Sequence, residues 1–127
     1  MSDYTLLNLE DAEDRAPGFG ITFGEVRFPR SEIGATQTGV AHQRIFPGER
    51  QPFGHRHERA EEIYLVLSGS GRVKLDDEVR ELRAHDLLRV APEVMRCFEA
   101  GPDGMEVLAF GAHHERDGET AQDFWQD

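Results

Sequence analysis

Apolar and polar residues alternate in short segments along most of this chain. Phe19, Ile21 and Phe23 alternate with small or polar residues, and the segment from Val40 to Phe46 repeats the pattern. Side chains two residues apart share one face of an extended strand, so this alternation predicts β-strands. Further short strands are expected at Tyr4–Leu9, Ile63–Leu67, Arg72–Leu75, Glu78–Leu82, Leu87–Val90, Met95–Phe98 and Met105–Phe110.

Turn-forming residues separate these segments. Pro17-Gly18 and Asp76-Asp77 mark two turns, and the run from Gly101 to Gly104 has strong four-residue turn chemistry. No stretch shows the apolar spacing of an amphipathic helix. About nine or ten short strands with regular turn signals predict an all-β fold, an antiparallel sandwich or barrel.

The stretch from Gly48 to Gly71 carries the chemistry. It reads GERQPFGHRHERAEEIYLVLSGSG, with His55 and His57 one residue apart and Glu62 just before an apolar strand. The two histidines share a face of an extended chain. A turn within residues 58–61 would carry the chain to the neighbouring strand and return Glu62 to that face. Two imidazoles and a carboxylate at one point are a common ligand set for a transition metal.

This stretch resembles the first motif of the cupin superfamily. Gly48, His55, His57, Glu62 and Gly69 fill the motif's places, with six residues rather than five between the first glycine and the first histidine. The resemblance covers roughly residues 38–110. It implies an antiparallel double-stranded β-helix, or jelly-roll barrel, and it implies His55, His57 and Glu62 as metal ligands.

Length and resemblance together predict the domain organisation. A chain of 127 residues suits one domain. We expect a single cupin domain over residues 1–127, with a barrel core at about 19–110, an N-terminal arm at 1–18 and a C-terminal tail at 111–127. The sequence shows no internal repeat or low-complexity segment.

The second cupin motif departs from the family pattern. Asp86, Pro92 and Phe98 set the register, and Arg96 then stands where the family has its fourth ligand, a histidine. Arginine stays protonated in proteins and has no lone pair to donate to a metal. The resemblance therefore carries over three ligand positions and not the fourth.

Several roles are open for Arg96. Its charge would oppose a metal ion, or it would form a two-pronged ion pair with Glu62 in place of the metal. It would otherwise anchor an anionic ligand in the barrel mouth, or lie at the rim beside Glu99. Tyr64 shares the alternation of Glu62, so it is expected to line the same cavity, either contacting a ligand or packing in the core.

Three other residues are candidates for a fourth ligand. His42 precedes the central stretch, His85 lies in a turn, and Cys97 would turn inward if the strand slipped by one residue. A lone cysteine in a strand is more often a small buried apolar residue. His113 and His114 are expected in a solvated tail, and Trp125 is expected to pack on the barrel exterior or on a partner subunit.

Composition and charge exclude some partners. The net charge is −11, with 25 acidic residues against 14 basic ones. Lys74 is the single lysine among the basic residues. Nucleic acids and anionic membranes are polyanions, so neither is an expected partner. The chain lacks an 18-residue apolar run and a charged-then-apolar leader. Cys97 has no second cysteine to pair with, and a reduced, cytoplasmic setting is expected.

Three function classes follow. The first is a metal-dependent enzyme, an oxygenase or isomerase, in which iron, manganese, zinc or nickel is held by the three ligands and acts on a small molecule. The second is a metal-free binding module for a small anionic molecule anchored by Arg96. The third is a structural or regulatory homodimer, in which cupins often exchange N-terminal strands such as the segment from Tyr4 to Leu9. We favour the first, because buried polar groups need partners and one metal would satisfy all three ligands.

Overall fold

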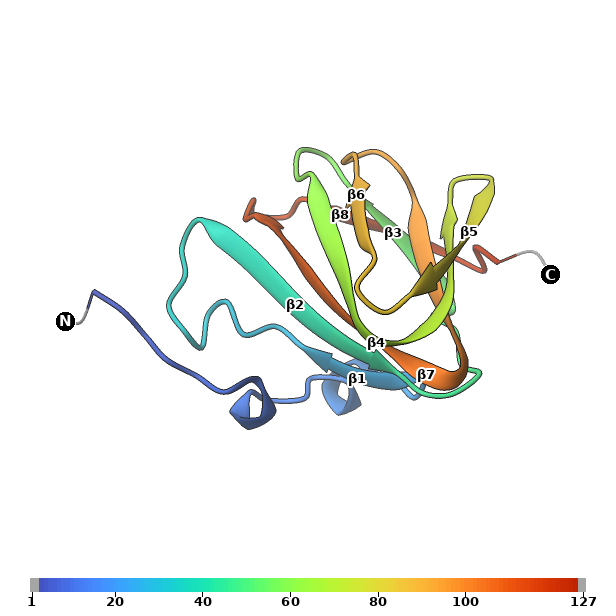
Figure 1. Ribbon diagram of the computed structural model, residues 1–127. Coiled ribbons are helices and arrows are strands. Elements are labelled where there is room, and N and C mark those ends of the chain that lie inside the picture. The colour runs from blue at the N-terminus through green and yellow to red at the C-terminus, as the bar shows by residue number, and fades with distance from the viewer. Residues whose placement is uncertain (1–2, 126–127) are drawn as a thin grey trace.

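The computed structural model describes residues 3–125, and within them the chain forms eight β-strands and two short 3-10 turns (Figure 1). The 3-10 turns are Leu9–Asp11 and Pro17–Phe19. The strands are β1 (Gly24–Arg27), β2 (Thr38–Ile45), β3 (Phe53–His57), β4 (Glu62–Leu75), β5 (Glu78–Arg83), β6 (Leu87–Val90), β7 (Arg96–Ala112) and β8 (Gly118–Gln122). All pairings are antiparallel, which confirms the expected all-β fold.

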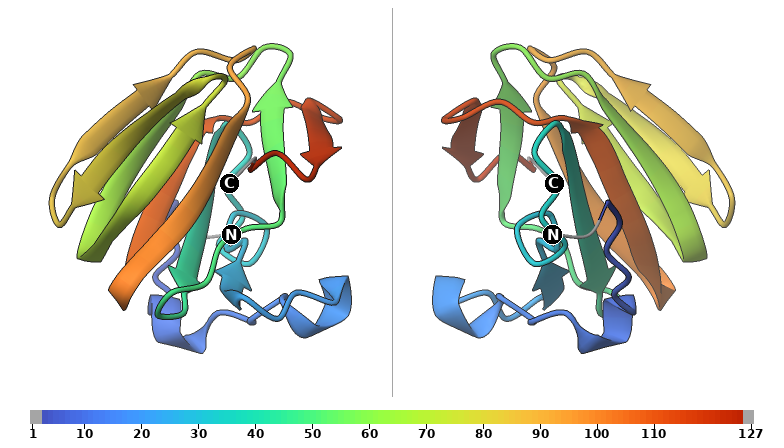
Figure 2. Two further views of the ribbon diagram at one scale, coloured as in Figure 1. Left: turned by 90° about the vertical axis from the view of Figure 1, so that its right-hand side faces the viewer. Right: turned by 90° about the vertical axis from the view of Figure 1, so that its left-hand side faces the viewer.

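Two long strands build the barrel. The first part of β4 pairs with β6 and the end of β7, and β7 continues the sheet through β2 to β1. The second part of β4 pairs with β5 and the start of β7, which leads on to β3 and β8. Because β4 and β7 belong to both halves, the sheet curls on itself. Figure 2 shows the two halves facing each other, with the N-terminal segment along the β1 side.

The core fills the space between the two halves. Alternate side chains of each strand point inward, as the period of two requires. The buried cluster contains Phe23, Ile45, Tyr64, Val66, Val73, Leu82, Val90, Phe98 and Met105. Full burial of each large apolar side chain contributes about 1.5–3 kcal/mol. This core holds the inner faces of β3 and β4, from which the candidate site is built.

The N-terminal expectations were wrong in detail. Residues 4–9 form no strand, and Tyr4 and Leu6 are 81% and 92% exposed. Phe19 ends a 3-10 turn, and Gly20 follows with a left-handed backbone (φ +68°), which breaks the strand alternation before Gly24. Exchange of residues 4–9 between two copies stays a prediction.

The predicted turn from Gly101 to Gly104 is a bulge inside β7. Gly69 of β4 pairs with Met105 while Gly71 pairs with Ala100, so four residues of β7 lie opposite one residue of β4. β7 pairs with β4 both before and after the bulge, and with β2 from Met105 onward, so β7 remains one continuous strand. The expected strands at Met95–Phe98 and Met105–Phe110 are therefore joined.

The backbones of β4 and β7 approach each other so closely at this bulge that Gly69 must be glycine. Gly69→Ala should therefore destabilise the fold by about 3 kcal/mol or more. Gly69 has φ +77°, and an added Cβ would lie 2.0 Å from the carbonyl oxygen of Gly104. Gly34→Ala is the matched control, since Gly34 has φ +72° but open space around it. It should cost about 1–2 kcal/mol, the backbone strain alone. Urea unfolding of both variants measures the difference, and equal losses would contradict it.

The described part of the C-terminal segment, up to Trp125, packs against the barrel. The segment expected as a polar tail contains β8, which pairs along the whole of β3. Trp125 packs on the exterior, where the guanidinium carbons of Arg50 and Arg72 lie 4.7 and 5.2 Å from its ring centre. Within residues 3–125, no helix has the length and apolar character needed to cross a membrane.

Candidate metal centre

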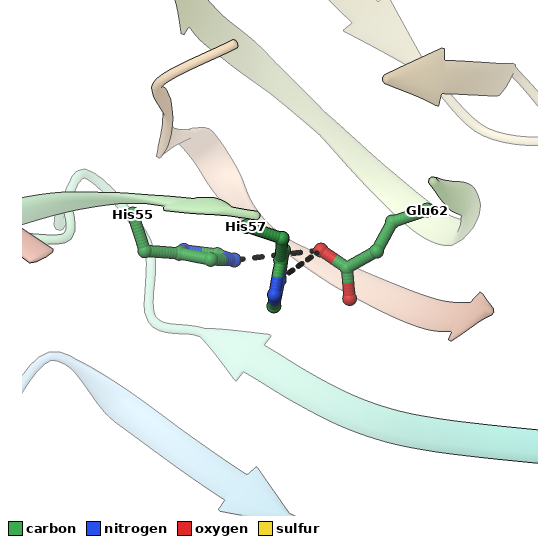
Figure 3. Close-up of side chains that lie close together, drawn as sticks. All are labelled: His55, His57 and Glu62. Carbon is green, nitrogen blue, oxygen red and sulfur yellow. Dashed lines mark hydrogen bonds and ion pairs between the residues drawn. The ribbon is translucent and has the colours of Figure 1, made fainter. Parts of the chain in front are cut away.

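His55, His57 and Glu62 converge on one point at the end of the barrel. Both histidines extend from the same face of β3, and Glu62 begins β4, with the three side chains pointing toward one another (Figure 3). Glu62 Oε1 lies 3.0 Å from His57 Nε2 and 3.5 Å from His55 Nε2. Each side chain is about one-fifth exposed, at 22%, 19% and 18% for His55, His57 and Glu62. A small molecule can therefore reach the cluster.

Asp117 builds the turn that returns Glu62 to the histidines. Its two carboxylate oxygens accept hydrogen bonds from the backbone N–H groups of Arg59 and Ala60, both at 2.9 Å. These bonds fix the connection between β3 and β4. Burial would raise the pKa of Asp117, but these two bonds and the charge of His57 hold it below its ordinary value.

Asp117 also lies beside the imidazole of His57, on the side of the ring away from Glu62. Its Oδ2 lies 3.4 Å from His57 Nδ1, while His57 Nε2 faces Glu62. Nδ1 makes no hydrogen bond in the described part of the chain, but the nearby carboxylate would favour a proton on Nδ1 when Nε2 binds a metal. Sequence reasoning missed Asp117, because it lies 55 residues beyond Glu62 in the segment taken as a tail. The only sequence feature that could have indicated Asp117 is its position just before β8, a strand that the sequence analysis did not predict.

Tyr64 completes the polar cluster. Its phenol donates a hydrogen bond to Glu62 Oε1 at 2.6 Å and lies 3.3 Å from His55 Nε2. The ring is buried and packs on Phe98, with the ring centres 4.9 Å apart. Burial and the nearby negative charge of Glu62 raise the pKa of Tyr64 well above its ordinary value. Tyr64 thus lines the site and also packs in the core; its contact with a ligand stays a prediction.

The electrostatic balance favours an ionised Glu62. Burial would raise its pKa, but hydrogen bonds with His55, His57 and Tyr64 outweigh that effect and hold the pKa of Glu62 far below its ordinary value. A carboxylate that stays charged at neutral pH, among groups that offer nitrogen ligands, is ready to bind a cation.

The lowered pKa predicts how Glu62 contributes to stability in protein treated with a chelator. Its folded-state pKa lies below that of the unfolded chain, so its stabilisation is complete above about pH 4.5 and is lost as pH falls through the folded-state pKa. Glu62→Gln should lower the unfolding free energy at pH 7 by about 2 kcal/mol. Urea unfolding across pH should show this gap narrowing below about pH 4. A gap that widens there would contradict the assignment.

Arg96 is fully buried beneath the site. One guanidinium nitrogen donates to the carbonyl oxygen of His55 at 3.4 Å and another donates to that of Ala91 at 3.1 Å. Its Nε has no hydrogen-bond partner among the described residues. The rim position is excluded by this burial, and the partners found for Glu62 within residues 3–125 do not include Arg96. Its role as an anchor for an anion stays a prediction.

The other candidate ligands lie elsewhere. His42 is buried on the opposite face of β2 from Ala41, with Nε2 2.6 Å from Glu106 Oε2. His85 occupies an exposed turn with φ +74°. Cys97 directs its thiol to the carbonyl oxygens of Gln51 and Phe53, and burial raises its pKa to about 11, so it remains a protonated thiol.

Two cavities meet at the cluster of His55, His57 and Glu62. One, the aromatic cavity, has a volume of about 290 Å³ and is lined by Ile21, Phe23, Val26, Phe28 and Phe53 together with His55, His57, Glu62 and Tyr64. The other, the histidine cavity, has about 330 Å³ and is lined by Arg30, His57, Glu62, His113 and His114. The two histidines expected in a solvated tail therefore border the site. Neither lining includes Arg96.

The donor set fits a transition-metal ion. Among the described residues, His55, His57 and Glu62 each offer one ligand atom, and these atoms lie within 4.8 Å of one another. Metal bonds to nitrogen and oxygen of about 2.0–2.2 Å allow two ligands of one ion to lie about 3–4 Å apart. The two distances to Glu62 Oε1 meet this condition without movement of the backbone.

Fold and site together define a class. A curled antiparallel barrel with two histidines and a glutamate converging at one end is a double-stranded β-helix with a candidate metal centre. The family model described as "Cupin domain" matches residues 41–110, more than half of the chain. The chain belongs to the cupin family, as the first-motif resemblance implied.

Solved structures support the fold. A cupin protein from Bacteroides fragilis has 26% identity and a TM-score of 0.74, covering 91% of this chain and 89% of that one. Oxalate decarboxylase from Bacillus subtilis has 21% identity and a TM-score of 0.75, covering 96% of this chain but 32% of that one. KdgF from Halomonas sp. has 20% identity and a TM-score of 0.65, covering 91% and 97%. No curated protein matches the chain in sequence.

Proposed function

We propose that this cupin binds a divalent transition metal through His55, His57 and Glu62 and uses it to act on a small molecule. The observation that carries the proposal is the convergence of two imidazole nitrogens and one ionised carboxylate on a partly accessible point. Imidazole ligands suit zinc, iron and nickel, and carboxylate ligands also suit manganese.

The surrounding residues support metal binding at this point. Asp117 faces Nδ1 of His57 and so favours presentation of Nε2, and Tyr64 orients Glu62 through its hydroxyl. Such outer partners orient ligands in known metal sites. When bound, the metal would supply a Lewis acid or a redox centre, either of which suits oxygenase or isomerase chemistry. The chain's own residues would hold and orient it.

The relatives do not carry a reaction over to this chain. Oxalate decarboxylase acts, by its name, on oxalate, but this chain spans about a third of that protein and shares 21% identity with it. One fold supports many reactions, so the reaction must be inferred from the site itself.

Elemental analysis of protein purified without affinity tags or chelators tests the proposal. We expect close to one equivalent of iron, manganese, zinc or nickel per chain. The same stoichiometry should return when the metal is removed with a chelator and added back. A content that remains far below one equivalent after reconstitution with each of the four metals would contradict the proposal.

A further inference from the structure

The two cavities share part of their walls and are together called the channel. Ala41 of β2 pairs with Ala109 of β7, and both residues line both cavities. Two residues earlier in β2, Gly39 pairs with Gly111, and both line the histidine cavity alone. In the other direction, Gln43 lines the aromatic cavity alone. The small residues leave room at the junction, where His57 and Glu62 also lie.

The aromatic cavity suits an apolar body. Away from His55, His57, Glu62 and Tyr64, its wall consists of five phenylalanine, isoleucine and valine side chains, two alanines and three polar residues. Its polar residues are partly used already, since Gln51 donates to Gln43 at 2.5 Å and accepts from the backbone of Phe98 at 2.9 Å. A sugar placed there would leave buried hydroxyl groups unpaired, which is costly.

The volume of the aromatic cavity limits the size of that body. An apolar cavity of about 150 Å³ holds one benzene molecule. A cavity of about 290 Å³ therefore holds a substituted ring or a branched chain of about ten non-hydrogen atoms.

Arg30 offers a positive charge at the other end of the channel. Arg30 lines the histidine cavity and donates to the carbonyl oxygen of Ala35 at 2.9 Å. Within residues 3–125, no carboxylate forms an ion pair with Arg30. The acidic neighbours Asp117 and Glu62 are engaged by backbone N–H groups and by the histidines and Tyr64. An anionic group beside Arg30 would thus gain a cation that the protein leaves unpaired.

We propose that the channel binds a compact apolar carboxylic acid, with its hydrocarbon body in the aromatic cavity and its carboxylate toward Arg30. The inference deepens the proposed function, because a molecule placed this way crosses the junction where the metal would lie. It differs from a small dianion such as oxalate, which has no hydrocarbon body to fill the cavity.

Titration calorimetry with three probes tests the ligand class. Phenylacetate has the expected body and charge, phenylacetamide has the body without the charge, and oxalate has the charge without the body. The full chain is titrated both loaded with zinc and treated with a chelator. Phenylacetate should bind about tenfold more tightly than phenylacetamide, the value of one hydrogen-bonded charge. In the chelator-treated protein, oxalate should bind more weakly than either aromatic probe.

Two variants separate the two ends of the channel. Ala41→Leu fills the junction and should weaken phenylacetate binding at least tenfold, while Val79→Leu on the exposed face of β5 should leave it unchanged. Arg30→Gln should remove the preference for phenylacetate over phenylacetamide. Arg80→Gln, at an exposed position of β5, should preserve that preference. Circular dichroism and the melting temperature confirm that each variant is folded.

The outcomes distinguish this inference from the proposed function. Selective phenylacetate binding by a protein that holds no metal would support the ligand class and contradict the metal-dependent function. Metal binding without selectivity for phenylacetate, or with binding insensitive to Ala41→Leu, would overturn the ligand class alone. If Arg30→Gln weakens the binding of phenylacetate and of phenylacetamide by the same factor, the carboxylate does not lie beside Arg30.

Discussion

His57→Ala should abolish stoichiometric metal binding while leaving the barrel folded. In the proposed site His57 supplies one of three ligand atoms, and its Nε2 lies 3.0 Å from the carboxylate of Glu62, which would supply another. Partners outside the ligand shell are worth roughly 10–100-fold in metal affinity. Loss of a ligand should therefore weaken metal binding by more than about 100-fold. Competition titration against a chromophoric chelator measures the change.

Arg56→Ala is the matched control for this substitution. Arg56 lies between the two histidines on β3, so its side chain points away from the site and pairs with Glu119 on the outside at 3.0 Å. An exposed pair of this kind contributes little to stability. Arg56→Ala should keep the metal affinity of the unchanged protein. Equal affinities in His57→Ala and Arg56→Ala would show that the metal, if bound, is held elsewhere.

Arg96→His should strengthen metal binding by about 100-fold or more. Arg96 is fully buried, and its guanidinium reaches the backbone of His55, one of the proposed ligands. At a separation on the order of 8–10 Å and an effective dielectric near 20, a divalent ion and a guanidinium repel by about 3–4 kcal/mol. The substitution removes that repulsion and places an imidazole where cupins usually have their fourth ligand.

Arg96→Met separates the two effects of Arg96→His. Methionine removes the charge without supplying a nitrogen ligand, so its gain in metal affinity reports relief of repulsion alone. The further gain in Arg96→His reports coordination by the new imidazole. The same competition titration applies to both, with the melting temperature as the check on folding. If neither folded variant binds metal more tightly, Arg96 does not oppose the metal in this protein.

The ligand cluster was predictable because it depends on short-range geometry. His55 and His57 share a face of β3 by the period of a strand, and a turn had to bring Glu62 to that face. The structure confirms both steps. The barrel was predictable because alternation and turn residues repeat along most of the chain, and the family match confirms it.

The remaining features depend on contacts between distant residues, which periodicity does not report. Asp117 closes the turn before Glu62 only because β8 pairs with β3. The residues from Gly101 to Gly104 have the chemistry of a turn, but the flanking pairings with β4 and β2 hold them within one strand. The burial of Arg96 likewise follows from packing around β7, since nothing in its neighbouring sequence distinguishes a buried position from a rim.

Anomalous X-ray diffraction from crystals loaded with zinc or iron, recorded at the absorption edge of that metal, tests the central claim most directly. We predict one strong anomalous peak per chain, about 2.0–2.2 Å from His55 Nε2, His57 Nε2 and a carboxylate oxygen of Glu62. Loaded crystals with no peak among these three side chains, or with the peak at another group of residues, would contradict the assignment.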